Sequence, residues 1–235
     1  MARVMDRQKL GEYLGRLIDA NPGNIVNEEG YKGHLLGSHD KAEETGEMTT
    51  EHYPGLRDEI DWESVRVAGG LHDMAKIFGR QVFHELWGSA YVDEHGLQDG
   101  ISDSERAVRY IAQAIRTHFV GSNQLDDEAN VAERAEFEKI YGPVDPVLMV
   151  PHTWPEAIVA HSELSSREDM HYPERIDDIQ YRFANVPSFR KLDPSLAEAI
   201  ERGRPRLLEM CEKVERLRDG KLSEQEIVRS FAFTR

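Results

Sequence analysis

The sequence has very little cysteine and no long apolar run. Cys211 is the one cysteine among 235 residues, so an internal disulfide and a cysteine-rich zinc site are both excluded. Its apolar surroundings in LLEMCEKV predict a buried thiol with a structural role. No stretch of about 18 apolar residues occurs, and residues 1–20 have no signal-peptide apolar region. We therefore expect a soluble, cytoplasmic protein without a membrane partner.

Positive charge is also scarce. The chain has 29 Lys and Arg against 44 Asp and Glu, which gives a formal net charge of −15. Nucleic-acid-binding domains carry a basic patch or stripe, and the overall balance offers none, so we expect no nucleic-acid partner. The sequence leaves the oligomeric state open, a homodimer included.

Alternation of apolar and polar residues with period two is missing over any convincing length, and no repeat is visible. Apolar stripes at helical spacing are frequent, so we predict an all-α fold in one domain, residues 1–235. We place terminal helices at 4–19 and 194–232. The apolar stripe of another expected helix, opened by a capping box at Ser102 and Glu105, is Val108, Ile111, Ile115 and Phe119.

The region 24–55 has a different character. Gly30, Gly33 and Gly37 indicate turns. The acidic stretch His39–Gly55 has few apolar residues, which predicts an exposed helix or a mobile flap that closes over a ligand.

The stretch Val65–Gly79, VRVAGGLHDMAKIFG, is the one around which the rest of the chain is organised. Asp61 is a good N-cap for a helix through it, and the Gly69-Gly70 pair indicates close packing against another helix or the site. On such a helix His72, Asp73 and Lys76 converge on one point. An imidazole, a carboxylate and a cation together suit a metal ion with a phosphate on it.

Further histidines lie near helix ends or on apolar helix faces. Several imidazoles with a carboxylate suit iron, manganese, zinc, nickel or cobalt, and an aspartate can bridge two such ions. The other histidines are interpreted as ordinary core or surface residues, namely His34, His52, His95, His152 and His171. The candidate metal ligands are His39, His72, Asp73, His84, His118 and His161.

The order and spacing of these residues resemble the HD-domain superfamily of metal-dependent phosphohydrolases. GGLHDMAK is similar to the family's A-x-L-L-H-D-I-G-K segment and lies 33 residues after His39. FHELWGSAYVDEHG and YIAQAIRTHFVG are similar to the next two family segments and supply His84 and His118. The resemblance covers residues 33–182 and implies an HD-type helical bundle with two divalent transition metals.

The resemblance departs from the family pattern at its last ligand. AHSELSSR stands where the family has an aspartate, which places His161 at that position. Asp169 and Glu163 are the alternatives, although Glu163 is two residues away and is expected to point elsewhere. His34 competes with His39 for the first position.

The resemblance implies hydrolysis of a phosphate ester or anhydride, with a nucleotide or dinucleotide as substrate. Asp73 would orient the metal and take a proton from the water, and Lys76 would contact phosphate oxygens. Further candidate phosphate ligands are Arg80, Arg116 and Arg167. Two other hypotheses remain: a diiron oxygenase on the same ligand set, and a non-catalytic module that binds a nucleotide.

Overall fold

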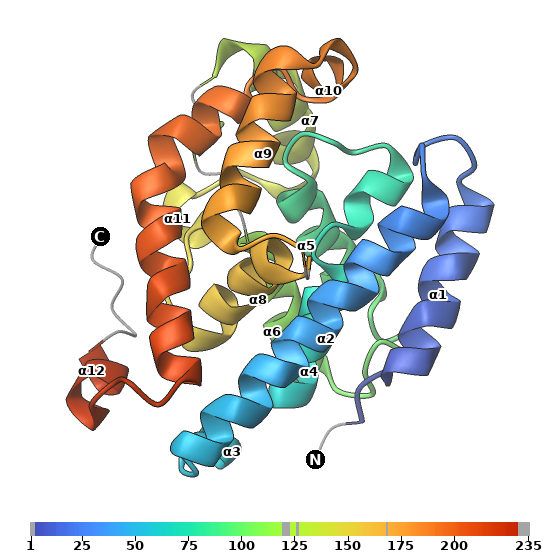
Figure 1. Cartoon of the computed structure of the whole chain (residues 1–235). Coiled ribbons are helices and arrows are strands. Elements are labelled where there is room, and N and C mark those ends of the chain that lie inside the picture. Colours follow the sequence, from blue (N-terminus) through green and yellow to red (C-terminus); the bar gives the residue numbers. More distant parts are fainter. Residues whose placement is uncertain (1–2, 119–122, 126, 168, 230–235) are drawn as a thin grey trace.

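Helices account for the regular secondary structure of the part of the chain that the computed structural model describes, residues 3–118, 123–125, 127–167 and 169–229 (Figure 1). The all-α prediction is confirmed, and within those residues the one extended pairing is an isolated bridge between Val4 and Ser102. None of the described helices is long and apolar enough to cross a membrane. The α-helices are α1 (Arg7–Ala20), α2 (Glu28–His52), α3 (Leu56–Glu59), α4 (Trp62–Leu71), α5 (His84–His95), α6 (Glu105–Arg116), α7 (Val131–Tyr141), α8 (Trp154–Ser165), α9 (Tyr172–Asn185), α10 (Pro187–Leu192), α11 (Leu196–Arg218) and α12 (Glu224–Arg229). Short 3-10 helices are η1 (Met74–Phe78), η3 (Glu128–Asn130) and η4 (Pro146–Met149).

Helix α8 is the centre of the bundle. It contacts α2, α4, α6, α9 and α11, and it lies between α2 and α11 in Figure 1. Every residue from Trp154 to Leu164 is buried, because neighbouring helices cover all sides of this short helix. A polar side chain on α8 is therefore held away from bulk water whichever way it points, and it needs a partner.

Helix α2 corrects two expectations for the region 24–55. Asn27 caps the helix by accepting from the Gly30 amide, and Gly30, Gly33 and Gly37 lie inside it rather than in turns. The acidic stretch is no flap, because one side of it is buried against α4. Small residues such as Ala42 and Gly46 make that contact, so a low content of large apolar residues gave a misleading signal.

Glycines bring α2 and α4 close together, as the sequence predicts for Gly69 and Gly70. A Cβ atom on Gly69 would lie 2.9 Å from the Ser38 carbonyl oxygen. One on Gly70 would lie 2.4 Å from Leu10 and 3.3 Å from the His39 Cβ. The cost of glycine inside a helix is thus offset by close helix packing.

The helix predicted through Val65–Gly79 begins where expected but is divided into two elements. Asp61 caps it by accepting from the Ser64 amide, but the α-helix stops at Leu71 and continues as the 3-10 helix η1. Gly79, at φ 82°, closes this segment as predicted.

Helix α1 confirms the predicted N-terminal helix, whereas the C-terminal helix predicted over 194–232 is divided into α11 and α12 within the described residues. The predicted capping box at Ser102 is wrong: Ser104 is the residue before α6, and the Ser102 hydroxyl donates to the Arg3 carbonyl. Phe119, the last residue of that predicted stripe, is outside the described residues, as are residues 230–232 of the predicted C-terminal helix. Cys211 is fully buried on α11, as its sequence context predicts.

Candidate metal centre

His72, Asp73 and Lys76 lie at the junction between α4 and η1. His72 is the last residue of helical geometry, and Asp73 begins the tighter 3-10 turn. The Lys76 Nζ lies 2.6 Å from Asp73 Oδ2, as expected for residues three apart in such a turn. The predicted convergence of these three side chains is therefore a local property of the chain, although a continuous α-helix does not produce it.

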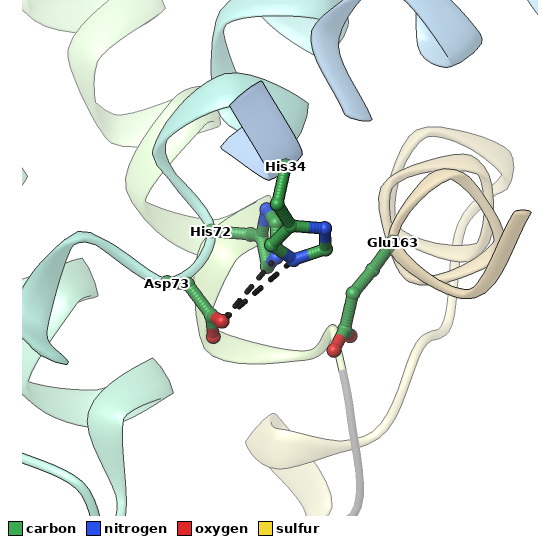
Figure 2. A group of neighbouring side chains, drawn as sticks. All are labelled: His34, His72, Asp73 and Glu163. Carbon is green, nitrogen blue, oxygen red and sulfur yellow. Dashed lines mark ion pairs between the residues drawn. The ribbon is translucent and has the colours of Figure 1, made fainter. Parts of the chain in front are cut away.

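The first group of possible ligands joins three elements. His34 from α2, His72, Asp73 and Glu163 from α8 offer ligand atoms that all lie within 4.8 Å of one another. Figure 2 shows their side chains directed toward one space, with both imidazoles paired to Asp73. The Asp73 Oδ2 atom lies 3.9 Å from His34 Nε2 and 3.7 Å from His72 Nε2.

The second group shares Asp73. His84, in the first turn of α5, and His118, just after α6, join it there. Asp73 Oδ1 lies 2.9 Å from His84 Nε2 and 3.5 Å from His118 Nε2. The two carboxylate oxygens of Asp73 thus face different groups of imidazoles, so this one side chain belongs to both groups of possible metal ligands.

Backbone carbonyls orient three of the four imidazoles. His72 Nδ1 lies 2.6 Å from the Gly69 oxygen, His84 Nδ1 lies 2.9 Å from the Gln81 oxygen, and His118 Nδ1 lies 2.6 Å from the Ile115 oxygen. A carbonyl only accepts, so Nδ1 of each ring carries a proton, and Nε2 is the ring nitrogen that faces the cluster. Metal-binding histidines are typically held by this kind of outer hydrogen bond.

The fourth imidazole, His34, has a different outer partner. Its Nδ1 lies 3.2 Å from the Ser166 hydroxyl, and its Nε2 faces Asp73.

Several polar atoms of the cluster are buried without a hydrogen-bond partner. They are His72 Nε2, Asp73 Oδ1 and Glu163 Oε2. Each such atom costs free energy, of order 1–3 kcal/mol, unless something else binds it. A divalent cation at each group would satisfy atoms of this kind, and the imidazole and carboxylate donors fit a transition metal.

Burial and charge set the protonation of the cluster. Desolvation lowers the pKa of His72 well below its usual value and that of His34 to about 4, so both rings are neutral at pH 7. Burial alone would raise the pKa of Asp73, but the charge of Lys76 and the contacts with His84 and His118 outweigh it and hold that pKa well below its usual value. The buried Glu163 has a raised pKa. Desolvation acts to lower the pKa of His118, but its hydrogen bond to Asp73 and the charge of Glu163 outweigh burial and raise that pKa. A metal ion binds neutral imidazoles and ionised carboxylates, so binding here would displace protons.

Two of the six predicted ligands lie elsewhere. The His39 Nδ1 contacts the Asp40 carboxylate, and His39 forms a separate group with Asp40 and Glu43. Arg7 pairs with Asp40 and Arg66 pairs with Glu43, so the carboxylates of that group already have cationic partners.

His161 is fully buried on another side of α8. Its Nε2 is bonded to Ser165 and lies 3.9 Å from the Glu215 carboxylate of α11. Glu163 takes the place expected for His161 and lies 3.9 Å from His118 Nε2. The expectation that Glu163 points elsewhere is wrong, because two residues are about 200° apart on a helix and α8 is turned with Glu163 toward the cluster. Asp169, the other alternative, is exposed and paired with Arg167.

Signals for the two missed residues are present in the sequence. Asn27 is a good N-cap, and starting a helix there would have placed His34 inside α2. Glu163 is a charged residue in the apolar run AIVAHSEL, and such a position indicates a buried carboxylate with a binding or catalytic role.

A cavity of about 510 Å³ opens onto the cluster. Its wall includes His34, Asp73, Lys76, His84 and Glu163, which places Lys76 beside the candidate metal ligands. The three arginines predicted to bind phosphate are not among its lining residues. Arg80 pairs with Glu133 and Glu136, Arg116 is largely buried near Asp93, and Arg167 lies by a different cavity.

No protein-family model, curated protein or solved structure matches this chain. The chemistry of the site therefore carries the functional argument.

Proposed function

We propose that this protein is a metal-dependent phosphohydrolase of the HD-domain type, which hydrolyses a phosphate ester or anhydride of a nucleotide-like substrate. The observation that carries the proposal is the position of Asp73. Its two oxygens face two groups of buried imidazoles, and Lys76 lies beside it on the wall of a cavity.

The ligand assignment follows the two groups. His34, His72 and Glu163 would hold one metal ion, His84 and His118 would hold the other, and Asp73 would bind both. Metal ions so placed supply an activated water and neutralise charge on a phosphoryl group.

Other features of the proposed site come from the protein's own side chains and from the cavity. Lys76, with its side chain 23% exposed, places a mobile point charge where phosphate oxygens would lie. Burial raises the pKa of Glu163, so a metal ion bound by its carboxylate would have to displace a proton. The cavity provides a partly enclosed space that limits competing water.

Metal content and phosphate release test the proposal together. Protein purified without chelator is analysed for transition metals and then supplied with nucleoside mono-, di- and triphosphates in the presence of manganese or iron(II). We expect about two metals per chain and release of inorganic phosphate, with both lost in Asp73→Asn. Absence of both metal uptake and phosphate release contradicts the proposal and favours a non-catalytic binding module.

The donor set favours one other function. Four imidazoles with two carboxylates bind iron well, so a diiron oxygenase on the same residues is the second candidate. Oxygen uptake in an electrode, measured on iron-loaded protein with the same substrates, separates the two. Oxygen uptake that requires both the substrate and Asp73 would contradict the phosphohydrolase and support the oxygenase.

A further inference from the structure

The cavity beside the metal cluster has a cation that no sequence pattern indicates. Arg175, in the first turns of α9, lines the cavity together with Lys76 and Glu163. Its side chain is 17% exposed, and its Nε atom is buried without a hydrogen-bond partner. The guanidinium therefore has hydrogen-bond capacity that the protein leaves unused, and an anion in the cavity is the kind of group that would use it.

The neighbours of Arg175 leave it incompletely compensated. Its closest carboxylate is Asp178, 3.3 Å from Nη1, and Asp178 is shared with Arg182 at 2.9 Å. Within hydrogen-bond distance, one carboxylate therefore serves two arginines, and the buried Glu163 is the other carboxylate whose charge acts on Arg175. Desolvation is the main cause of the lowered pKa of His34, and the charge of Arg175 is a smaller contribution, after that of Lys76.

Beyond Arg175 most of the residues on the cavity wall are apolar. Ile179 and Phe183 follow at intervals of four residues on α9 and lie about 6 and 12 Å from Arg175 along the helix axis. The Phe183 ring packs on Phe189 of α10, with ring centroids 5.5 Å apart. Leu192 and Leu196 extend this wall.

We propose that Arg175 and Lys76 together bind the terminal phosphoryl group of a phosphomonoester whose apolar or aromatic body lies against Ile179, Phe183 and Phe189. The inference rests on the proposed function, because the phosphoryl group is the part of the substrate that the metal cluster would act on. Arg175 is thereby a specificity-determining residue that the sequence analysis did not identify.

The same wall disfavours a longer phosphate chain. Past Arg175 the cavity offers Arg182, which is already paired with Asp178, and the buried carboxylate of Asp193. A di- or triphosphate would place further negative charges against apolar rings and a carboxylate. The proposed substrate is therefore a monophosphate.

Binding of two phosphonates tests this without turnover. Phenylphosphonate and methylphosphonate carry the same anionic group on a carbon–phosphorus bond that hydrolysis of esters leaves intact, and they differ in the apolar body. Calorimetric titration of the metal-loaded protein under argon gives a Kd for each. We expect phenylphosphonate to bind about 10-fold more tightly, because burying an aromatic ring is favourable.

Matched variants separate the two parts of the site. Arg175→Met should weaken both phosphonates by about 10- to 100-fold through loss of a charge-assisted contact. Phe183→Ala should remove the advantage of phenylphosphonate and leave methylphosphonate unchanged. Arg167→Met, an arginine by a different cavity, should change neither Kd. Circular dichroism checks the fold, and Arg175→Lys, which keeps the charge and loses the fork, should weaken binding less than Arg175→Met.

The inference is overturned if Arg175→Met leaves both dissociation constants within twofold of those of the parent protein. If Arg175→Met does not fold, the same criterion applies to Arg175→Lys. It is overturned as well if phenylphosphonate has no advantage over methylphosphonate. Phosphonate binding that depends on Arg175 in a protein that releases no phosphate would refute the phosphohydrolase and keep the anion site. Phosphate release by a protein whose phosphonate binding does not depend on Arg175 would support the phosphohydrolase and refute the anion site at Arg175.

Discussion

Asp73 Oδ1 lies 2.9 Å from the Nε2 atom of His84, although the first residue follows α4 and the second begins α5. Phe83, just before His84, has a left-handed backbone with φ 50° and is fully buried. This unusual conformation turns the chain into α5 so that His84 faces Asp73. A non-glycine residue held in this region costs of order 1–3 kcal/mol, which surrounding packing must offset.

Replacing Asp73 tests whether one carboxylate serves both groups. Asp73→Asn keeps the shape and removes the negative charge, so we expect metal content to fall at both groups and not at one alone. Asp40→Asn is the control, because Asp40 is an aspartate in a surface pair with Arg7. Elemental analysis with circular dichroism measures the outcome. Retention of one full equivalent of metal would show that Asp73 does not bridge.

Glu163 and His161 offer a second test on one helix. Glu163→Gln removes a charged donor of the first group, and we expect metal affinity to fall by at least the factor of about 10–100 typical of disrupted metal sites. His161→Gln should keep the metal and lower the free energy of unfolding by about 1–3 kcal/mol, because it disturbs a buried hydrogen bond to Ser165. Metal titration and urea unfolding distinguish them. The reverse result would restore His161 as the ligand.

Two glycines of α2 should respond in opposite ways to the same substitution. A Cβ on Gly46 would lie 2.6 Å from the Trp62 ring, so Gly46→Ala is expected to destabilise by about 1–3 kcal/mol. Gly33 is exposed with nothing within 4 Å of such an atom, so Gly33→Ala should stabilise by up to about 1 kcal/mol. Urea denaturation gives both values. Equal effects would mean that α2 does not pack on Trp62 in this way.

Buried His39 predicts a dependence of stability on pH. Desolvation lowers its pKa in the folded protein, despite the hydrogen bond to Asp40. The unfolded state therefore binds a proton near pH 6.5 that the folded state does not, and stability is lost as pH falls below that value. Unfolding of metal-free protein at pH 7.5, 6.5 and 5.5 should show a smaller loss in His39→Gln than in the parent. An unchanged loss would mean that His39 titrates alike in both states.

Much of the fold follows from local patterns. Asp61 as a cap and Gly79 as the last residue of the predicted segment locate the start of α4 and the end of η1, because these signals act within a few residues. Helix α2 was harder to predict. Its stability depends on close contact of Ala42 and Gly46 with α4, and such contact has no signature in residue-by-residue propensity.

The sequence by itself determined the all-helical architecture and the proximity of His72, Asp73 and Lys76, since neighbours in one turn are close whatever surrounds them. The tertiary structure decided which member of each alternative pair faces the cluster. His34 and His39 are about 140° apart on a helix, and His161 and Glu163 about 200° apart. Only the rotation of α2 and α8 against α4, fixed by packing at glycines and small side chains, selects His34 and Glu163.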